Sequence, residues 1–411
     1  MTRRTRAVLA GLLLAATVLA ACSQDDSDSS SRTRTTETSG AEATRPDATA
    51  PAGDAFRIGL TAQLSGANSI AYRGLEMAVD AWEQSVNKQG GINGHPVEVF
   101  VEDTGGDAAK GLATVQELVE SDRIQALVLL DPATDNAVHT YTQEQQIPVV
   151  SPFASYPIWN STPGWFALGI PAFPQSIEAT IDILLDEGAS SVGAVVCAEV
   201  AACGAVDSVM NNLAETADVR YDGAARVAAS APNYTAECLL FADKKTEVIY
   251  LGTAGEVARR FAEDCASQGY NPSFLFPYHA FQPANLEIED ISAIGLLPTV
   301  PWYANVPATR DFRRALKQYG EIEEADETSM YAWVSLEAIR EALQQAQLTP
   351  EATRAQVIDA MSNLRTDLGG LISEVSFAPG QPSPAITCYF LGAIENGKFT
   401  TPDGTEPKCL D

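Results

Sequence analysis

The stretch FRIGLTAQLSGANSIAYRGLEMAVDAWEQSVNKQGGING occupies residues 56–94 and contains a strand, a turn and a helix in succession. Its short apolar opening predicts a buried parallel strand over 56–60. The apolar stripe over 70–82 is typical of an amphipathic helix, and the glycines of 90–94 are expected to end it. A second strand is predicted over 97–101. The stretch therefore predicts a βαβ unit.

The same alternation of short apolar runs and helical stripes continues along the chain. Further strands are predicted at 126–130, 147–150, 166–169, 192–196, 219–227, 248–251 and 273–276. Further helices are predicted at 108–120, 134–145, 175–187, 205–216, 234–242, 256–268, 309–319, 329–345 and 350–363. Two such series in tandem predict an α/β protein with two doubly wound parallel-sheet lobes.

As a set, the strand at 56–60, the turn Leu64-Ser65-Gly66, the helix with Gly74 and the GGING run resemble the type I periplasmic solute-binding proteins. The nearest branch is that of the branched-chain amino acid and amide binders. The resemblance continues through IPVVSP at 147–152 and covers residue 56 to the C-terminus. It implies three crossings between the lobes, the later two in 295–303 and 385–394. It assigns lobe 1 to 56–171 and 300–385, and lobe 2 to 172–299 and 386–411.

The first 22 residues have the pattern of an export signal, with three arginines before the apolar run 7–19. Leu19-Ala20-Ala21-Cys22 also resembles the lipoprotein cleavage box, which implies that Cys22 is lipidated. The alternative is an ordinary signal peptide with a chance cysteine. The apolar run is too short to span a membrane. Arg3 and Arg4 also fit a twin-arginine signal, although Arg6 stands where that signal has an apolar residue, so the export route stays open.

Residues 23–55 are rich in small, polar and acidic residues and predict a disordered tether. Together, the lipid and the tether imply a protein anchored to the outer face of the cytoplasmic membrane. The 411-residue chain has a formal net charge of −28, which disfavours nucleic acid as a partner. We expect a monomer.

Six cysteines follow Cys22, and an even number in an exported chain indicates disulfides. Fifteen pairings are possible, and we expect the three local ones: Cys197–Cys203, Cys238–Cys265 and Cys388–Cys409. A metal site would need close spacings such as C-x-x-C, and the sequence has none.

The resemblance implies that the ligand lies between the lobes, which close over it by hinge motion. The first expected contact segment is 65–69, with Ser65, Asn68 and Ser69 as candidate ligand-binding residues. The family pattern is longer at this point, so Tyr72 is an alternative contact.

The second segment follows the strand at 126–130 and carries Thr134 and Asp135. The family has serines here that bind a ligand carboxylate beside a helix N-terminus. The alternative is that Thr134 or Asp135 only caps the helix. An ionised Asp135 near a ligand carboxylate would be unfavourable.

The third segment follows the strand at 147–150. Ser155 matches the position where the family places a threonine hydroxyl on the ligand. Phe153 stands where a small residue gives its backbone carbonyl. Both are candidate ligand-binding residues.

Lobe 2 supplies Phe173, Tyr278 and His279 as candidate contacts. Members of the family that bind α-amino acids hold the ammonium with carboxylates in these regions, and this chain has none there. Because a buried ammonium without an anionic partner is costly, we predict that the ligand is not a plain zwitterionic amino acid. An aromatic cleft for a neutral or weakly polar solute is expected from Phe153, Tyr156, Trp159, Phe173, Tyr278, His279 and Phe281, with core packing as the alternative for each.

No catalytic motif accompanies these residues. The chain has three histidines and lacks G-x-S-x-G, H-E-x-x-H and a phosphate-binding loop. We therefore expect neither an enzyme nor a cofactor or metal. The resemblance implies a small-molecule solute and an ABC permease in the membrane as partners. A lipoprotein that senses its ligand and signals without transport is the alternative.

Overall fold

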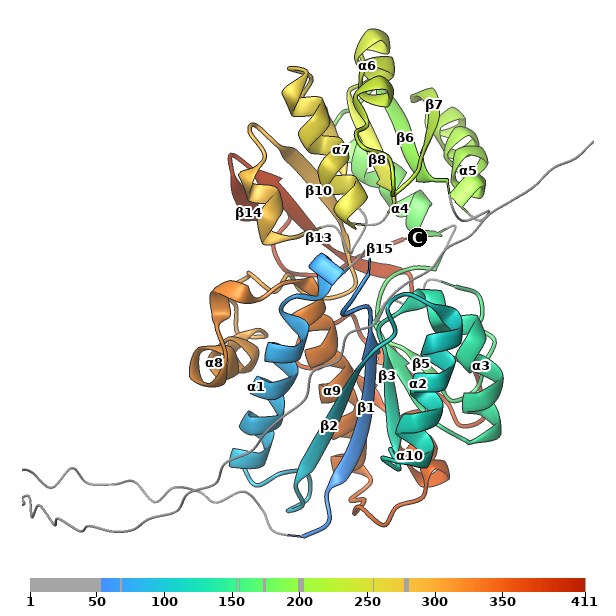
Figure 1. Cartoon of the computed structure of the whole chain (residues 1–411), viewed down its shortest axis with the longest axis vertical. Coiled ribbons are helices and arrows are strands. Elements are labelled where there is room, and N and C mark those ends of the chain that lie inside the picture. The colour runs from blue at the N-terminus through green and yellow to red at the C-terminus, as the bar shows by residue number, and fades with distance from the viewer. Residues whose placement is uncertain are drawn as a thin grey trace, which may run out of the picture. The chain divides into compact units, whose positions relative to one another are not determined.

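The computed structural model in Figure 1 describes residues 53–66, 69–152, 154, 156–172, 175–198, 203–253, 255–276 and 281–410. The predicted signal segment with Cys22, and residues 23–52 of the predicted tether, lie outside the described residues. No described helix is both long enough and apolar enough to cross a membrane.

The first sheet has five parallel strands in the order β2-β1-β3-β4-β5. They are β1 (Phe56–Ala62), β2 (Val97–Asp103), β3 (Ala126–Leu129), β4 (Val149–Ser151) and β5 (Trp165–Ala167). Because all five run in one direction, the loops that follow β1, β2, β3 and β4 emerge at the same edge of the sheet.

Helices cover both faces of the first sheet (Figure 1). They are α1 (Leu75–Lys88), α2 (Ala108–Glu120), α3 (Asp135–Glu144), α8 (Arg310–Tyr319), α9 (Glu327–Gln345) and α10 (Arg354–Ser362). On β3, Val128 joins the apolar cluster that contains α1 and α9, whereas Leu127 and Leu129 join the cluster that contains α2 and α3. This alternation explains why the strand reads as continuously apolar.

The first helix begins later than the sequence predicts. The stripe at 70–82 suggested a helix from Ile70, but a 3₁₀ turn, η1 (Ser69–Tyr72), comes first, and α1 starts after Gly74. The Gly74 N–H donates to Asp326 Oδ2 at 3.0 Å, and a Cβ on Gly74 would lie 2.4 Å from Ser329 Oγ. Asp326 also caps α9, so a long-range contact sets the start of α1.

The second sheet has eight strands: β6 (Ser191–Cys197), β7 (Arg220–Val227), β8 (Val248–Gly252), β9 (Ser273–Leu275), β10 (Ser292–Leu297), β13 (Cys388–Glu395), β14 (Lys398–Thr400) and β15 (Lys408–Cys409). The strands from β6 to β10 pair in parallel, and β13 pairs antiparallel with β10. Helix α4 (Gln175–Asp186) precedes β6, and α5 (Cys203–Thr216), α6 (Thr235–Lys244) and α7 (Gly255–Ser267) lie between the strands that follow. The mixed α/β architecture is the predicted two-lobed one; the residue boundaries of the lobes stay a prediction.

The segment 295–303, where the resemblance implies a crossing between the lobes, is a strand only at its start. The sequence suggested an extended segment over 295–303, but β10 ends at Leu297. Pro298 and Pro301 lack the N–H that a central strand must donate, so the ladder stops there. Short elements that the sequence did not predict are β11 (Arg365–Thr366), β12 (Val375–Ser376), η2 (Pro132–Thr134), η3 (Pro283–Glu287) and η4 (Ile322–Glu324).

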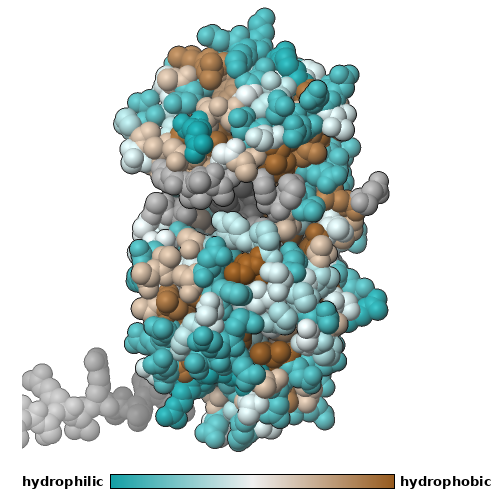
Figure 2. All heavy atoms as spheres, turned by 90° about the vertical axis from the view of Figure 1, so that its right-hand side faces the viewer, coloured by the Kyte–Doolittle hydropathy of each residue, from teal (hydrophilic) through white to brown (hydrophobic). Residues whose placement is uncertain are grey.

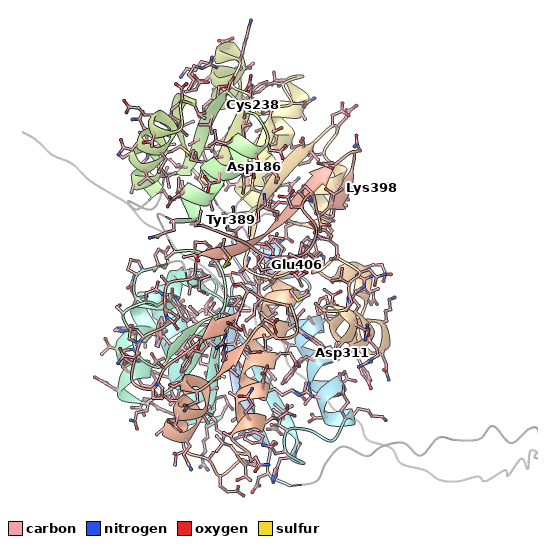
Figure 3. All side chains as sticks on the ribbon, turned by 180° about the vertical axis from the view of Figure 1, so that it is seen from behind. Asp186, Cys238, Asp311, Tyr389, Lys398 and Glu406 are labelled. Carbon is pink, nitrogen blue, oxygen red and sulfur yellow. A yellow bond between two sulfur atoms is a disulfide. The ribbon has the colours of Figure 1, made fainter. Side chains whose placement is uncertain are left out.

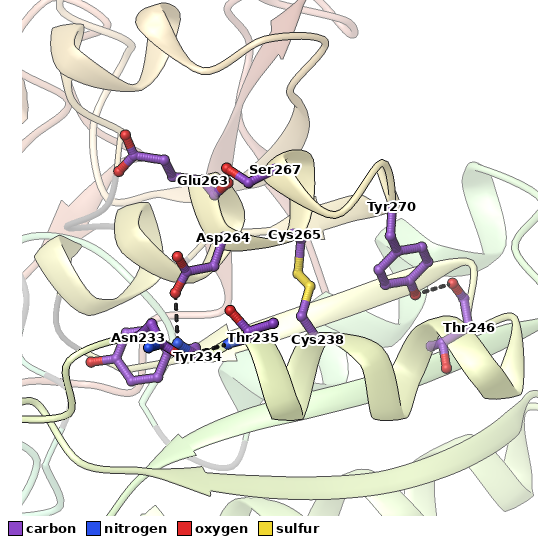
Figure 4. The surroundings of a disulfide bond; sticks show 10 residues. All are labelled: Asn233, Tyr234, Thr235, Cys238, Thr246, Glu263, Asp264, Cys265, Ser267 and Tyr270. Atoms are coloured by element: carbon purple, nitrogen blue, oxygen red, sulfur yellow. Dashed lines mark hydrogen bonds between the residues drawn. A yellow bond between two sulfur atoms is a disulfide. The ribbon is translucent and has the colours of Figure 1, made fainter.

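The structure contains all three expected disulfides. Cys197–Cys203 joins the end of β6 to the start of α5, and Cys388–Cys409 joins the paired strands β13 and β15. Cys238–Cys265 ties α6 to α7, and both cysteines are fully buried (Figure 4). Each bond closes a local unit, as the sequence analysis expects.

The outer surface is predominantly polar on the face in Figure 2, where hydrophobic residues are scattered. This distribution suits a protein whose many acidic residues face solvent.

Candidate functional site

The loops that follow three neighbouring strands meet at the carboxyl edge of the first sheet. Gln63 follows β1, Thr104 follows β2 and Asp131 follows β3. Gln63 Nε2 donates to Asp131 Oδ1 at 2.6 Å, and Thr104 Oγ1 donates to Asp131 Oδ2 at 2.5 Å. The backbone N–H of Ala133 also donates to Asp131 Oδ1, at 3.0 Å. Asp131 is fully buried, so these donors replace the water that its carboxylate loses.

Ser65 lies beside this network but binds a second carboxylate. Its backbone N–H and its hydroxyl donate to the two oxygens of Asp103 at 3.0 and 2.5 Å. Lys110 Nζ lies 2.6 Å from Asp103 Oδ2. Partial burial acts to raise the pKa of Asp103, but the hydrogen bonds from Lys110, Ser65 and Gly105 outweigh it and lower that pKa. The Ser65 hydroxyl is therefore held by an ionised carboxylate, and Ser69 begins η1 nearby.

Thr134 is fully buried, and its hydroxyl donates to the backbone carbonyl of Asp131 at 2.8 Å. Its side chain forms no capping hydrogen bond at the start of α3, and Asp135 is the first residue of that helix. The predicted capping role falls instead to Asp131, at the start of η2.

Asp135 is a buried carboxyl group at the same edge of the sheet, with only 2% of its surface exposed. The indole Nε1–H of Trp159 donates to its Oδ2 at 2.7 Å. Burial, and to a lesser extent the charge of Asp131, raise the pKa of Asp135 to about 8, against the effect of the Trp159 bond. At neutral pH this side chain is therefore mostly a neutral acid, which donates as well as accepts hydrogen bonds.

Tyr156 lies close to both carboxyl groups. Burial raises the pKa of its phenol, and the charges of Asp135 and Asp131 raise it further. The residue is nevertheless 39% exposed, so it is the member of this group that solvent reaches. We call Asp131, Asp135, Tyr156 and Trp159 the Asp135 cluster.

Two aromatic residues expected to line the cleft are core residues instead. Trp159 and Phe281 are both fully buried or nearly so. Trp159 packs on Trp165 with ring centroids 4.7 Å apart, and Phe281 packs on Phe276 at 5.6 Å. The candidate residues that lie outside the described part of the chain are Asn68, Phe153, Ser155, Phe173, Tyr278 and His279.

Glu327 is a buried acid that the sequence analysis did not single out. Burial raises its pKa well above the ordinary value, and the charge of Asp326 adds to this effect. Its Oε2 accepts from the hydroxyl of Tyr331 at 3.3 Å. Glu327 is the first residue of α9, where an acid is common, so the sequence carries no signal that this side chain is buried. Among the described residues, no group of three or more His, Cys, Asp or Glu could hold a metal ion.

Comparison with known proteins extends these observations. A family model described as periplasmic binding protein matches residues 55–398. Curated proteins gave no match.

Several solved structures share the fold. One is a solute-binding protein of an ABC transporter from R. palustris in complex with benzoate, with 17% identity, a TM-score of 0.72, and coverage of 87% of this chain and 98% of that one. Another is a fatty acid ABC transporter substrate-binding protein from Thermomonospora curvata, with 17% identity, a TM-score of 0.69, and coverage of 85% and 93%. A leucine-binding protein from Thermotoga maritima has 14% identity, a TM-score of 0.67, and coverage of 84% and 97%.

At these identities the structural matches show the shared two-lobed fold, whereas the family model spans most of the chain. The chain therefore belongs to the periplasmic binding protein family, whose members bind solutes outside the cytoplasm and are not enzymes.

Proposed function

We propose that this chain is a lipid-anchored receptor that captures a small molecule between its two lobes and delivers it to an ABC importer. The family match over residues 55–398 supports solute binding, and the structural neighbours include ABC transporter proteins. The Leu-Ala-Ala-Cys22 box supports anchoring at the outer face of the cytoplasmic membrane.

The Asp135 cluster supports a particular class of ligand. The hydroxyls of Ser65 and Thr134 already donate to protein acceptors, so they are poorly placed to hold a ligand carboxylate. Asp131 adds a buried negative charge beside that position. A carboxylate here would face repulsion with few free donors, which disfavours a plain zwitterionic amino acid.

A neutral, weakly polar solute suits the same groups better. Neutral Asp135 can donate to an acceptor on the solute, and the ring of half-exposed Tyr156 offers an apolar contact. The observation that carries this proposal is the buried, hydrogen-bonded position of Asp135 at the carboxyl edge of the first sheet.

Two measurements test the ligand class. Native mass spectrometry of the purified protein should reveal a co-purified small molecule that is not a zwitterionic amino acid. Calorimetric titration with leucine, isoleucine and valine should give no binding. Tight binding of any of the three would refute the ligand class while leaving the family assignment intact.

Substitutions of Asp135 test the site itself, once that solute is identified. Asp135→Asn keeps a hydrogen-bond donor and should leave the affinity at pH 7 within a few-fold. Asp135→Leu keeps the branched shape of the side chain, although it is larger, and has no donor; losing one hydrogen bond inside the site should weaken binding by about tenfold or more. Equal affinity in both variants would exclude Asp135 as a contact. Uptake of the solute by cells with and without the gene separates transport from sensing.

A further inference from the structure

Helix α8 carries an unusual concentration of positive charge on one face. Four cationic side chains follow one another at the i, i+3, i+4, i+7 spacing of a single helix face: Arg310, Arg313, Arg314 and Lys317. The opposite face is buried through Phe312 and Leu316. The apolar contacts fix the orientation of the helix, so the cations point away from the core.

This concentration is not what the composition of the chain would produce. The chain has 26 Lys and Arg against 54 Asp and Glu, and only 20 of those cations follow residue 50. The ten residues of α8 hold four of these 20, with Asp311 as the one acid among them. Like charges three and four positions apart destabilise a helix, so the repulsion among these four cations lowers the stability of α8.

Nearby acidic side chains neutralise these four cations poorly. Arg314 pairs with Asp311 at 3.0 Å, but both side chains are more than half exposed, so the pair is weak. Asp311 is visible on this helix in Figure 3. Arg313 NH1 reaches the backbone carbonyl of Tyr303 at 3.5 Å. Within the described part of the chain, Arg310 and Lys317 have no ion-pair partner.

The cations also share a concave surface. Together with Asn305 and Gln318 they line a groove of about 720 Å³. The groove is an open hollow of the surface rather than an enclosed cavity, and it is large enough for a phosphate group. Asn305 and Gln318 add neutral hydrogen-bond donors, so the groove offers charge and directional donors to one guest.

We propose that the α8 groove binds phosphate-bearing anions, either free or as the headgroup of an anionic phospholipid. A phosphate group carries more acceptor oxygens than a carboxylate, in a tetrahedral array, and can bind several guanidinium groups at once. The acidity of the whole chain does not prevent this, because a Debye length of about 8 Å at physiological ionic strength confines repulsion to near neighbours. The groove is separate from the Asp135 cluster, and its occupancy does not depend on the proposed transport function.

The test uses the full chain and soluble probes, so that membrane partition does not enter. Calorimetric titrations are made with inorganic diphosphate, with dihexanoyl phosphatidylglycerol below its micelle concentration, and with dihexanoyl phosphatidylcholine as the zwitterionic control. At low salt we expect binding of at least one anionic probe, weakened steeply as salt rises. Diphosphate alone would identify a free anion as the guest, and phosphatidylglycerol binding would identify the lipid headgroup.

The matched variants are Arg310→Gln/Lys317→Gln in the groove and Lys245→Gln/Lys398→Gln elsewhere on the surface. Both remove two exposed cations, so they change the net charge equally. The groove variant should bind about 30-fold more weakly, the equivalent of about 2 kcal/mol for two cations near an anionic group, and the control should bind as the unchanged protein does. Unchanged melting temperatures verify that both variants are folded. Absence of binding to both anionic probes, or equal weakening in both variants, would overturn the proposal.

Discussion

The buried acid Asp135 makes the stability of this protein depend on pH in a predictable direction. Its pKa is raised from 3.8 to about 8 in the folded state, so the folded chain holds this proton more tightly than the unfolded chain. The contribution of this group to the free energy of unfolding is fully present below pH 3.8 and is lost as the pH rises towards 8. Asp135→Asn removes the titration while keeping an oxygen that accepts from Trp159.

The size of the effect follows from the same linkage. Each pH unit between the two pKa values costs about 1.4 kcal/mol, so the unchanged protein should lose about 3 kcal/mol relative to Asp135→Asn between pH 5 and pH 7. For a folded part of roughly 340 residues, this difference corresponds to about 4 °C in melting temperature.

Urea unfolding at pH 5, 6, 7 and 8 measures the difference directly. The two stability curves should separate steadily as the pH rises, with Asp135→Asn the more stable at pH 8. Asp131→Asn is the comparison: its amide oxygen can still accept from Gln63, but its NH2 group cannot accept from Thr104, so it should destabilise the protein at every pH. It should keep most of the pH dependence of Asp135, because burial raises that pKa more than the charge of Asp131 does. Parallel curves for the unchanged protein and Asp135→Asn would refute the buried, protonated assignment.

Two further substitutions test the packing. Gly74→Ala places a Cβ 2.4 Å from Ser329 Oγ and should destabilise by about 1–3 kcal/mol in urea unfolding, whereas Glu76→Ala on the exposed face of α1 should have little effect. Equal stability of the two would contradict the close approach of α9. Replacing Cys388 and Cys409 by Ala opens a link across 21 positions and should cost about 3 kcal/mol; an unchanged urea midpoint would count against that bond.

The sequence predicted most of the helices and strands because apolar periodicity and helix caps are signals contained in neighbouring residues. Helix α2 has the predicted bounds, 108–120, and Asp107 caps it by accepting from the backbone N–H of Lys110 at 2.7 Å. The predicted start of α1 was wrong because the Gly74 N–H donates to Asp326, the capping residue of α9, which lies more than 250 positions away. No periodicity within 56–94 contains that contact.

The sequence likewise predicted only part of the candidate site. The order of strands and loops predicted which segments lie at the carboxyl edge of the sheet, and Ser65, Thr134 and Asp135 belong to those segments. It did not predict which side chains bond to one another. The indole of Trp159 reaches Asp135 from beyond β4, and its burial against Trp165 depends on side-chain directions that appear only in three dimensions.

The position of β13 has a consequence for how the chain matures. This strand lies beside β10 in the second sheet, although 90 residues separate the two in sequence. Until residues 388–395 have been synthesised, β10 presents an unpaired edge of the kind that recruits foreign strands. A chain that stopped after α10 would keep every strand of the first sheet and leave that edge of β10 open, so C-terminal truncation should promote aggregation through this edge.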